Sequence, residues 1–173
     1  MQGRRFTDWL VYLAVRVFIC TVQAMQMSTC RRLAAHLSWI TSHVLHVREN
    51  VIDENLREVF PSMKLSDRTR LTRAMWEHLI IMACEIAHAP RKIHRTNWRR
   101  YFTMHKNRQM MEYFLDNRPT IVVSGHFGNF EMAGFAAGLL GFPSYTIIRP
   151  LDNQFLNQFI NRFRSLHGQY ILE

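Results

Sequence analysis

The residues best suited to chemistry lie in one short run, IVVSGHFGNFE, which occupies residues 121–131. A β-branched stretch leads into Ser124 and Gly125, His126 stands in the turn, and Glu131 falls in the first turn of the helix expected next. A carboxylate that accepts the Nδ1–H of a histidine leaves Nε2 free to take a proton from an attacking hydroxyl. His126 and Glu131 are therefore a candidate general base and its orienting acid.

The same run limits the mechanism. Gly125 and Gly128 let the backbone turn tightly, and the amides at a helix N-terminus can hold a developing oxyanion. Ser124 lacks the surrounding G-x-S-x-G elbow, so acyl-serine chemistry is not predicted. The residues alone are equally consistent with a structural role, in which His126 is a turn residue and Glu131 complements the helix dipole.

The elements that would position this run alternate between strands and helices. The predicted strands are residues 120–124, 144–148 and 169–172, and the predicted helices are residues 129–140 and 153–167. Such alternation implies a parallel sheet with right-handed crossovers, in which ligands bind beyond the carboxyl ends of the strands, where His126 lies. Because the chain ends as the third strand begins, we expect the polypeptide to be a fragment of a longer domain.

The first half of the chain is predicted to be helical. Apolar residues recur at helical spacing over residues 30–47 and 50–60, and Phe60-Pro61 ends the second helix. A longer helix is expected to begin at an N-cap at Ser66-Asp67 and to stop at Pro90.

The N-terminal segment is mostly apolar from Trp9 to Val22 but carries Arg16 near its middle. A spanning helix needs about 20 apolar residues, and an arginine at mid-bilayer costs roughly 3 kcal/mol. Arg4 and Arg5 would keep that end cytoplasmic if the segment inserted. Three interpretations stay open: a weak transmembrane anchor, a helix lying in the membrane interface, and a buried first helix.

Composition and charge describe a globular protein with anionic partners. The chain has 173 residues, of which 48% are hydrophobic and 20% charged, which excludes disordered and collagen-like classes. Lys and Arg number 22 against 13 Asp and Glu, for a formal net charge of +9. This excess favours phosphates, acidic proteins, nucleic acids or an anionic membrane as partners. Cys20, Cys30 and Cys84 are widely spaced and are predicted to be reduced thiols.

The segment 91–108 carries seven Lys and Arg side chains and no acid, with aromatic residues interleaved. Anionic lipid, lipid phosphates, an acidic carrier protein or a nucleic acid would bind such a surface, and a solvated basic face without a partner is the remaining interpretation. Because no helix-turn-helix, RRM or zinc-finger pattern is present, no nucleic acid is expected. Glu85 and His88 have di-iron spacing without the second copy that such a site needs, so no metal site is predicted.

The motif resembles that of a known family. The block Ser124–Glu131, followed by RPLDN at 149–153 and NRFR at 161–164, is similar to the bacterial lipid A biosynthesis acyltransferases. These are the lauroyl and myristoyl transferases, within the wider lysophospholipid acyltransferase superfamily. Asn55-Leu56 and Phe60-Pro61 also look like that family, so the resemblance covers nearly the whole chain.

The resemblance implies a role for five residues. His126 would be the general base and Glu131 its partner, with Glu an accepted variant of the acid. Arg149 would lie near the donor or acceptor phosphate, and Arg149, Gly128 and Asn129 are the candidate substrate-binding residues. The resemblance also implies an acyl thioester donor, on acyl carrier protein or coenzyme A, and a membrane lipid acceptor. Because the thioester is already activated, no metal or other cofactor is expected.

Together these expectations define one fold and one function. The fold class is α/β, with a helical N-terminal part followed by the first βαβαβ of a mostly parallel sheet of acyltransferase type. We expect a membrane-associated helix at 1–28, a helical part at 29–117 and the first, incomplete portion of the α/β core at 118–173.

The expected function is transfer of a fatty acyl chain to a hydroxyl of a membrane glycolipid, such as a lipid A precursor, on the cytoplasmic face of the cell inner membrane. The alternative is a non-catalytic truncated relative that only binds an anionic membrane surface. Members of the family continue past the point where this chain ends, with further strands and a later acidic motif.

Overall fold

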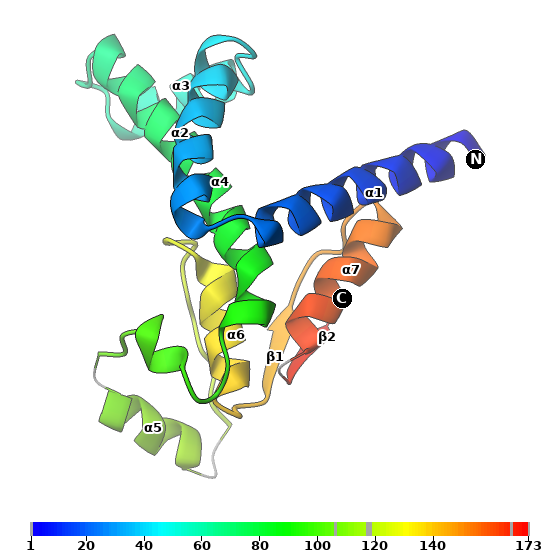
Figure 1. Cartoon of the computed structure of the whole chain (residues 1–173). Coiled ribbons are helices and arrows are strands. Elements are labelled where there is room, and N and C mark those ends of the chain that lie inside the picture. The colour runs from blue at the N-terminus through cyan, green and yellow to red at the C-terminus, as the bar shows by residue number, and fades with distance from the viewer. Residues whose placement is uncertain (1, 106, 117–118, 167, 173) are drawn as a thin grey trace. The chain divides into compact units, whose positions relative to one another are not determined.

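The computed structural model describes residues 2–105, 107–116, 119–166 and 168–172 (Figure 1). The chain forms two compact units, one of residues Ile19–His88 and one of Met1–Phe18 together with Ala89–Glu173. The boundaries between these units fall inside two helices, α1 (Gln2–Ala24) and α4 (Leu65–Lys92). The three-part division that the sequence suggests therefore stays a prediction, and each unit is described by itself.

The first unit is helical, built from the end of α1, from α2 (Met27–His43) and α3 (Glu49–Val59), and from most of α4. Its core contains Val22, Cys30, Cys84 and Ala87, each less than a tenth exposed. A buried polar contact accompanies this apolar cluster, because Gln23 Nε2 donates to the carbonyl of Ala87 at 2.7 Å. The last turn of α1 is thus held against α4 within this unit.

The helix boundaries confirm some sequence predictions and correct others. α3 ends at Val59 with Phe60 as its C-cap, as expected. α4 begins at Leu65, and the carbonyl of Lys64 accepts the amides of Asp67 and Arg68, so the helix begins before the predicted cap. Pro90 lies inside α4 instead of stopping it. A proline removes only its own N–H from the helix, and just two further helical residues follow Pro90.

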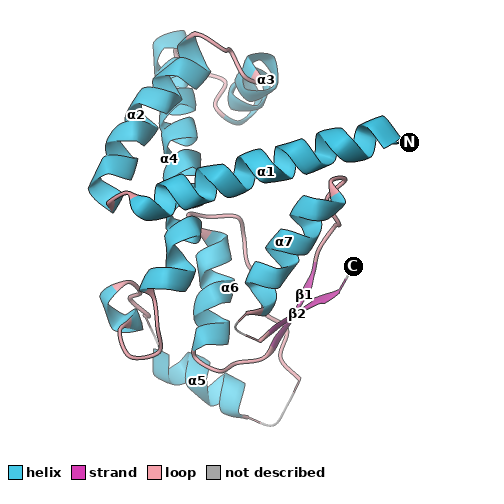
Figure 2. Ribbon diagram, turned by 45° about the vertical axis from the view of Figure 1, so that its right-hand side comes forward, coloured by secondary structure: helices cyan, strands magenta, loops and turns pink. Residues whose placement is uncertain are grey.

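The second unit contains the α/β elements, shown in Figure 2. In chain order these are the short 3₁₀ helix η1 (Trp98–Arg100), α5 (Asn107–Leu115), α6 (Phe130–Leu139), β1 (Ser144–Ile147), α7 (Gln154–Ser165) and β2 (Gln169–Leu172). β1 and β2 pair in parallel from Ser144 opposite Gln169 to Ile147 opposite Leu172. A parallel pair needs a crossover connection, and α7 supplies it. The predicted α/β class, helical first and parallel afterwards, is confirmed.

The strand predicted at residues 120–124 is wrong within that confirmed class. The described segment 119–124 has no strand structure, and the sheet found among the described residues has two strands, β1 and β2. The side chains of Ile121 and Val123 are 89% and 90% exposed. Strand propensity reflects packing on a pleated, half-buried surface. The β-branched residues here have no such surface, so their preference for extended backbone does not produce a strand.

Side-chain packing positions α6 above the sheet. Phe135 of α6 stacks on Phe163 of α7, with ring centroids 5.8 Å apart. Gln169, at the start of β2, is 7% exposed and its amide fills the space where a side chain on Gly134 would lie. Because both α6 and α7 contact β2, the amino end of α6 has a defined place in the unit.

Candidate functional site

His126 lies in the loop before α6 and its side chain is exposed. Its ring meets the ring of Phe130 edge-on, with centroids 4.3 Å apart. Gly128, two residues later, has φ +56°, a left-handed conformation that a glycine adopts without strain. The imidazole of His126 is therefore exposed to solvent near the amino end of α6, two residues before the left-handed Gly128.

Asn129 caps that helix. Its side-chain Oδ1 accepts the amide of Met132 at 3.4 Å, and its backbone is not helical. An asparagine in this position satisfies one of the amides that a helix start leaves without an intrahelical acceptor. The sequence-predicted residues Gly128 and Asn129 thus form the turn and cap that place His126.

Glu131 stands in the first turn of α6, as expected, but its partner is Arg164 of α7. Arg164 Nε donates to Oε2 at 3.1 Å and Nη2 donates to Oε1, so the pair is bidentate. The two side chains are 17% and 18% exposed. Within the described part of the chain, the hydrogen bond expected between His126 and Glu131 is absent. The carboxylate instead joins α6 to α7.

Arg164 is the functional neighbour that sequence reasoning left without a role. It lies in the block NRFR, 33 residues after Glu131, in the last turn of α7. A basic side chain in the last turn of a helix interacts favourably with the helix dipole whether or not it has an acidic partner. The position of Arg164 in the sequence therefore does not predict its pairing with Glu131. Only the crossover geometry of the α/β unit brings it to Glu131.

Arg149 follows the carboxyl end of β1 and is exposed. The amide of Ile148 donates to the carbonyl of Leu172 at 3.0 Å, so the pairing of the two strands continues up to the residue before Arg149. The guanidinium thus stands at the edge of a parallel sheet where ligands of such folds bind.

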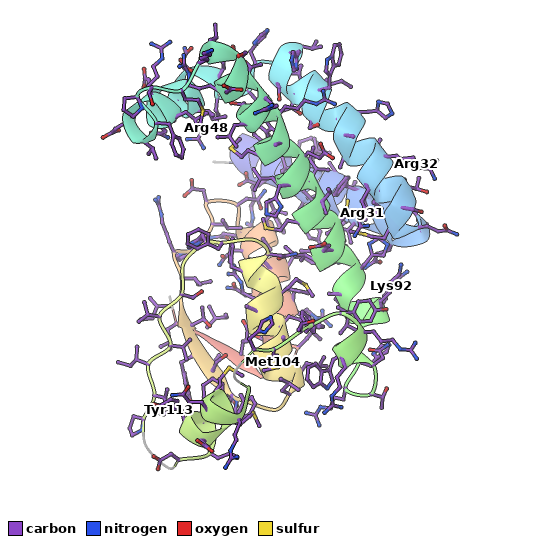
Figure 3. All side chains as sticks on the ribbon, turned by 90° about the vertical axis from the view of Figure 1, so that its left-hand side faces the viewer. Arg31, Arg32, Arg48, Lys92, Met104 and Tyr113 are labelled. Carbon is purple, nitrogen blue, oxygen red and sulfur yellow. The ribbon has the colours of Figure 1, made fainter. Side chains whose placement is uncertain are left out.

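The basic segment 91–108 is only partly used within the protein. Arg95 Nε donates to the carbonyl of Leu139 at the C-terminal end of α6, at 3.1 Å, and Arg99 lies over the ring of Trp98 at 4.8 Å. Arg91 and Lys92, at the end of α4, are exposed; Lys92 is labelled in Figure 3. Part of this surface thus remains accessible to an anionic partner.

Metal ligation has no support in the described residues, which contain no group of three or more His, Cys, Asp or Glu placed to hold an ion. His88, part of the di-iron-like spacing, is buried, with 5% of its surface exposed. Its Nδ1 faces the carbonyl of Cys84 at 2.8 Å and its Nε2 faces that of Met25 at 3.1 Å. Its ring nitrogens are therefore occupied by structural contacts.

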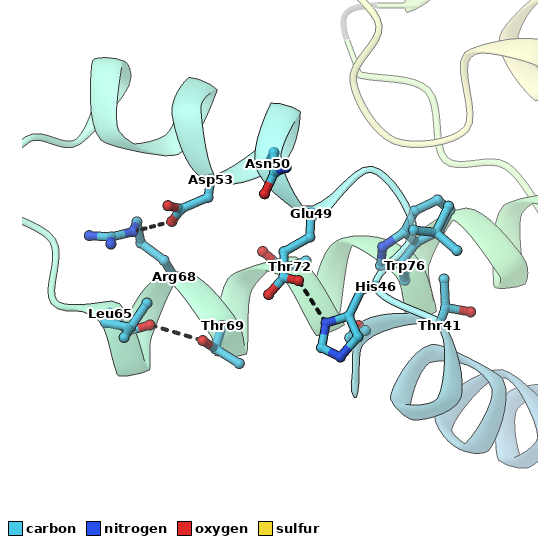
Figure 4. A pocket seen from close by; sticks show the side chains of 12 residues that line it. Thr41, His46, Glu49, Asn50, Asp53, Leu65, Arg68, Thr69, Thr72 and Trp76 are labelled. Atoms are coloured by element: carbon cyan, nitrogen blue, oxygen red, sulfur yellow. Dashed lines mark hydrogen bonds and ion pairs between the residues drawn. The ribbon is translucent and has the colours of Figure 1, made fainter. Parts of the chain in front are cut away.

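A cavity of about 150 Å³, roughly the volume of five waters, lies in the helical unit and contains none of the predicted site residues (Figure 4). Its wall includes Asp53, which accepts Arg68 Nε at 2.6 Å and pairs with Arg57 at 2.7 Å. The hydrogen bond from Arg68, aided by the charge of Arg57 and opposed by burial, holds the pKa of Asp53 below its ordinary value. These pairs tie α3 to α4.

The fold and site together define a class. A parallel strand–helix–strand unit with a solvent-facing histidine at a helix N-terminus is a frame for proton transfer on a bound substrate. Over residues 2–173 the chain matches the family model described as "Bacterial lipid A biosynthesis acyltransferase", and it belongs to that family. No curated protein and no solved structure matches the chain.

Membership carries a general function: acyl transfer of the lipid A type, with an acyl donor and a lipid acceptor, in association with a membrane. α1 adds a structural indication. By length and composition, residues Arg5–Ala24 would suffice to cross a bilayer, and only 6% of that stretch is buried. Signal sequences near an N-terminus share the length and composition of such a helix.

Proposed function

We propose that this chain transfers a fatty acyl group from a thioester, on acyl carrier protein or coenzyme A, to a hydroxyl of a membrane glycolipid such as a lipid A precursor. The observation that carries the proposal is the exposed imidazole of His126 at the amino end of α6, in a chain of the lipid A acyltransferase family. The site would face the cytoplasm at the inner membrane, where thioester donors are found.

The reaction needs one proton acceptor and one oxyanion site. His126 takes the proton of the acceptor hydroxyl as its oxygen attacks the thioester carbonyl carbon. The tetrahedral oxyanion that forms is stabilised by amides at the amino end of α6 and by Arg149. When the oxyanion collapses, the C–S bond breaks, and the departing thiolate receives the proton from His126. An ester and a free thiol result, without a metal or other cofactor.

Glu131 acts through His126 in this proposal. Arg164 binds both of its oxygens, and each oxygen keeps a further lone pair. Glycines on both sides of His126 allow the loop to rotate, so that Nδ1–H meets the carboxylate while Arg164 keeps it oriented. Gly128 and Asn129 then lie close to the substrate: Gly128 provides the turn of the loop, and Asn129 caps α6.

The test is transfer of a labelled acyl chain from an acyl thioester to a lipid A precursor in mixed micelles. His126→Ala should lower turnover about 10²–10⁴-fold, the usual contribution of a general base. His105→Ala, which removes another exposed histidine of the same unit, is the matched control and should leave turnover unchanged.

Equal turnover in the two variants would overturn the assignment of His126. A wild-type chain that binds anionic vesicles yet transfers no acyl group would instead support the alternative function, a non-catalytic relative that only binds membrane.

A further inference from the structure

One face of α1 is docked on the α/β unit. The ring of Tyr12 lies 6.1 Å from that of Phe155 and 6.2 Å from that of Phe159, both on α7. The guanidinium of Arg16 lies 5.0 Å from the centroid of the Phe159 ring, a cation–π contact. The side chain of Asn153, the N-cap of α7, donates to the carbonyl of Asp8 at 2.8 Å. Residues 8–16 of α1 are thus attached to α7.

Between residues 5 and 24, the charged and amide side chains of α1 share the side of the helix on which Tyr12 lies. At 100° per residue, Arg5, Asp8, Arg16 and Gln23 all lie within about 40° of Tyr12 around the helix axis. No other charged or amide side chain occurs between residues 5 and 24.

Over residues 5–24, the rest of the α1 surface is largely apolar and exposed, and its polar members are Thr7 and Thr21. It carries large side chains that are all at least 40% accessible, namely Phe6, Trp9, Leu10, Val11, Leu13, Val17 and Phe18. A contiguous apolar surface of this kind on a protein marks a contact with a lipid or a partner. Separation of a docked side that holds the charged residues from a largely apolar surface is the pattern of a helix lying in a membrane interface.

A spanning orientation conflicts with the docking. Crossing the hydrocarbon core takes about 30 Å, which uses all of residues 5–24 and puts residues 8–16 inside the core, with Arg16 near its centre. α7 would be carried there too, together with its exposed Gln158 and Arg162. Each arginine at that depth costs roughly 3 kcal/mol on insertion scales. The last turn of α1 is also covered, since Val22 is 1% exposed in the helical core.

The charges that flank α1 agree with this argument. Arg4 and Arg5 precede its apolar stretch, and Arg31 and Arg32 follow its end within eight residues. Arg31 and Arg32 are exposed on α2 and are labelled in Figure 3. Basic residues close to an apolar helix stay on the cytoplasmic side. Basic residues at both ends therefore place both ends on one side of the membrane.

We propose that α1 does not cross the bilayer: it lies along the surface of one leaflet, with Phe6, Leu13 and Val17 in the lipid and Tyr12 and Arg16 against α7. The inference deepens the proposed function, and it rests on that function only in taking a lipid bilayer as the partner. It gives the α/β unit a fixed orientation, with α7 behind the part of α1 that contacts the lipid.

Topology is tested with the full chain carrying one epitope tag at each end, expressed in a bacterium and exposed to protease in intact spheroplasts. Both tags should survive in intact spheroplasts and both should be digested after lysis, with the chain in the membrane fraction. Digestion of either tag in intact spheroplasts would overturn the proposal, because one end would then have crossed. Recovery of the chain in the soluble fraction would overturn it as well.

Lipid contact is tested by flotation with anionic phospholipid vesicles. Leu13→Asp, on the apolar face, should lower the vesicle partition coefficient by about tenfold or more. Val59→Asp, which places the same charge on an exposed apolar residue of α3 (66% accessible), should leave it unchanged. Equal binding by the two variants would overturn the assignment of this face. Neither measurement depends on acyl transfer, so failure of the proposed function and failure of this inference are distinguishable.

Discussion

Replacing Arg164 by methionine removes the two donors that hold Glu131 while keeping most of the aliphatic stem that packs in the α/β unit. The carboxylate would then be left with less than a fifth of its side chain exposed and without its cation. Breaking a fully buried pair costs about 3–5 kcal/mol, whereas an exposed pair contributes about 0–1 kcal/mol. For this partly buried, bidentate pair we expect a loss of about 2 kcal/mol, or a decrease in melting temperature of about 4–8 °C.

The assay is thermal unfolding by circular dichroism, with urea unfolding as a second measurement. Arg162→Met is the matched control, because Arg162 lies two residues earlier on α7 and is exposed. A double-mutant cycle of Arg164→Met with Glu131→Gln should give a coupling energy of about 1 kcal/mol or more. Equal losses of stability in Arg164→Met and Arg162→Met, or a coupling energy near zero, would refute the argument that this pair joins α6 to α7.

Two further predictions concern the helical unit. Because the pKa of Asp53 is lowered, chiefly by the hydrogen bond from Arg68, its stabilising contribution is present above the ordinary aspartate pKa of about 3.9 and is lost as the pH falls through the folded-state value. The difference in melting temperature between wild type and Asp53→Asn should therefore shrink on acidification, and a difference independent of pH would contradict this. Burial, with the neighbouring Cys30 thiol, raises the pKa of Cys84 to about 11. Cys30 and Cys84 are also buried, whereas Cys20 is exposed. N-ethylmaleimide at neutral pH should therefore label Cys20 and leave Cys30 and Cys84 unlabelled until the protein unfolds. Peptide mass spectrometry checks this, and labelling of Cys84 in the folded protein would contradict it.

Local features of the fold depend on a few neighbouring residues and follow from the sequence. Asn129 and Asn153 cap α6 and α7 through hydrogen bonds to amides two or three residues away. α7 ends at Ser165 with Leu166 as its C-cap, and Gly168, which precedes β2, has φ +85°, a conformation that glycine adopts without strain. Such contacts are local in the chain, so composition and spacing are enough to predict them.

Two secondary-structure predictions were wrong because the structure there depends on segments that are distant in the chain. The β-branched run at 120–124 has the composition of a strand, but a strand also needs a hydrogen-bonding neighbour, and none is paired with it in the described structure. Pro90 has the composition of a helix end, yet α4 continues to Lys92. In both cases the local preference was real and tertiary context decided the result.

In the candidate site, too, the sequence determines some features and the tertiary structure determines others. The sequence alone determined that a histidine would stand in a glycine-flanked turn before a helix, that an acid would occupy the first turn of that helix, and which family the motif resembles. Tertiary structure alone decided that Glu131 pairs with Arg164 and that the polar face of α1 is docked on α7. Caps and turns form between residues a few positions apart, whereas these contacts join residues 33 and 145 positions apart. Only the packing of α6 and α7 on β2, and of α1 on α7, brings such residues within reach of each other.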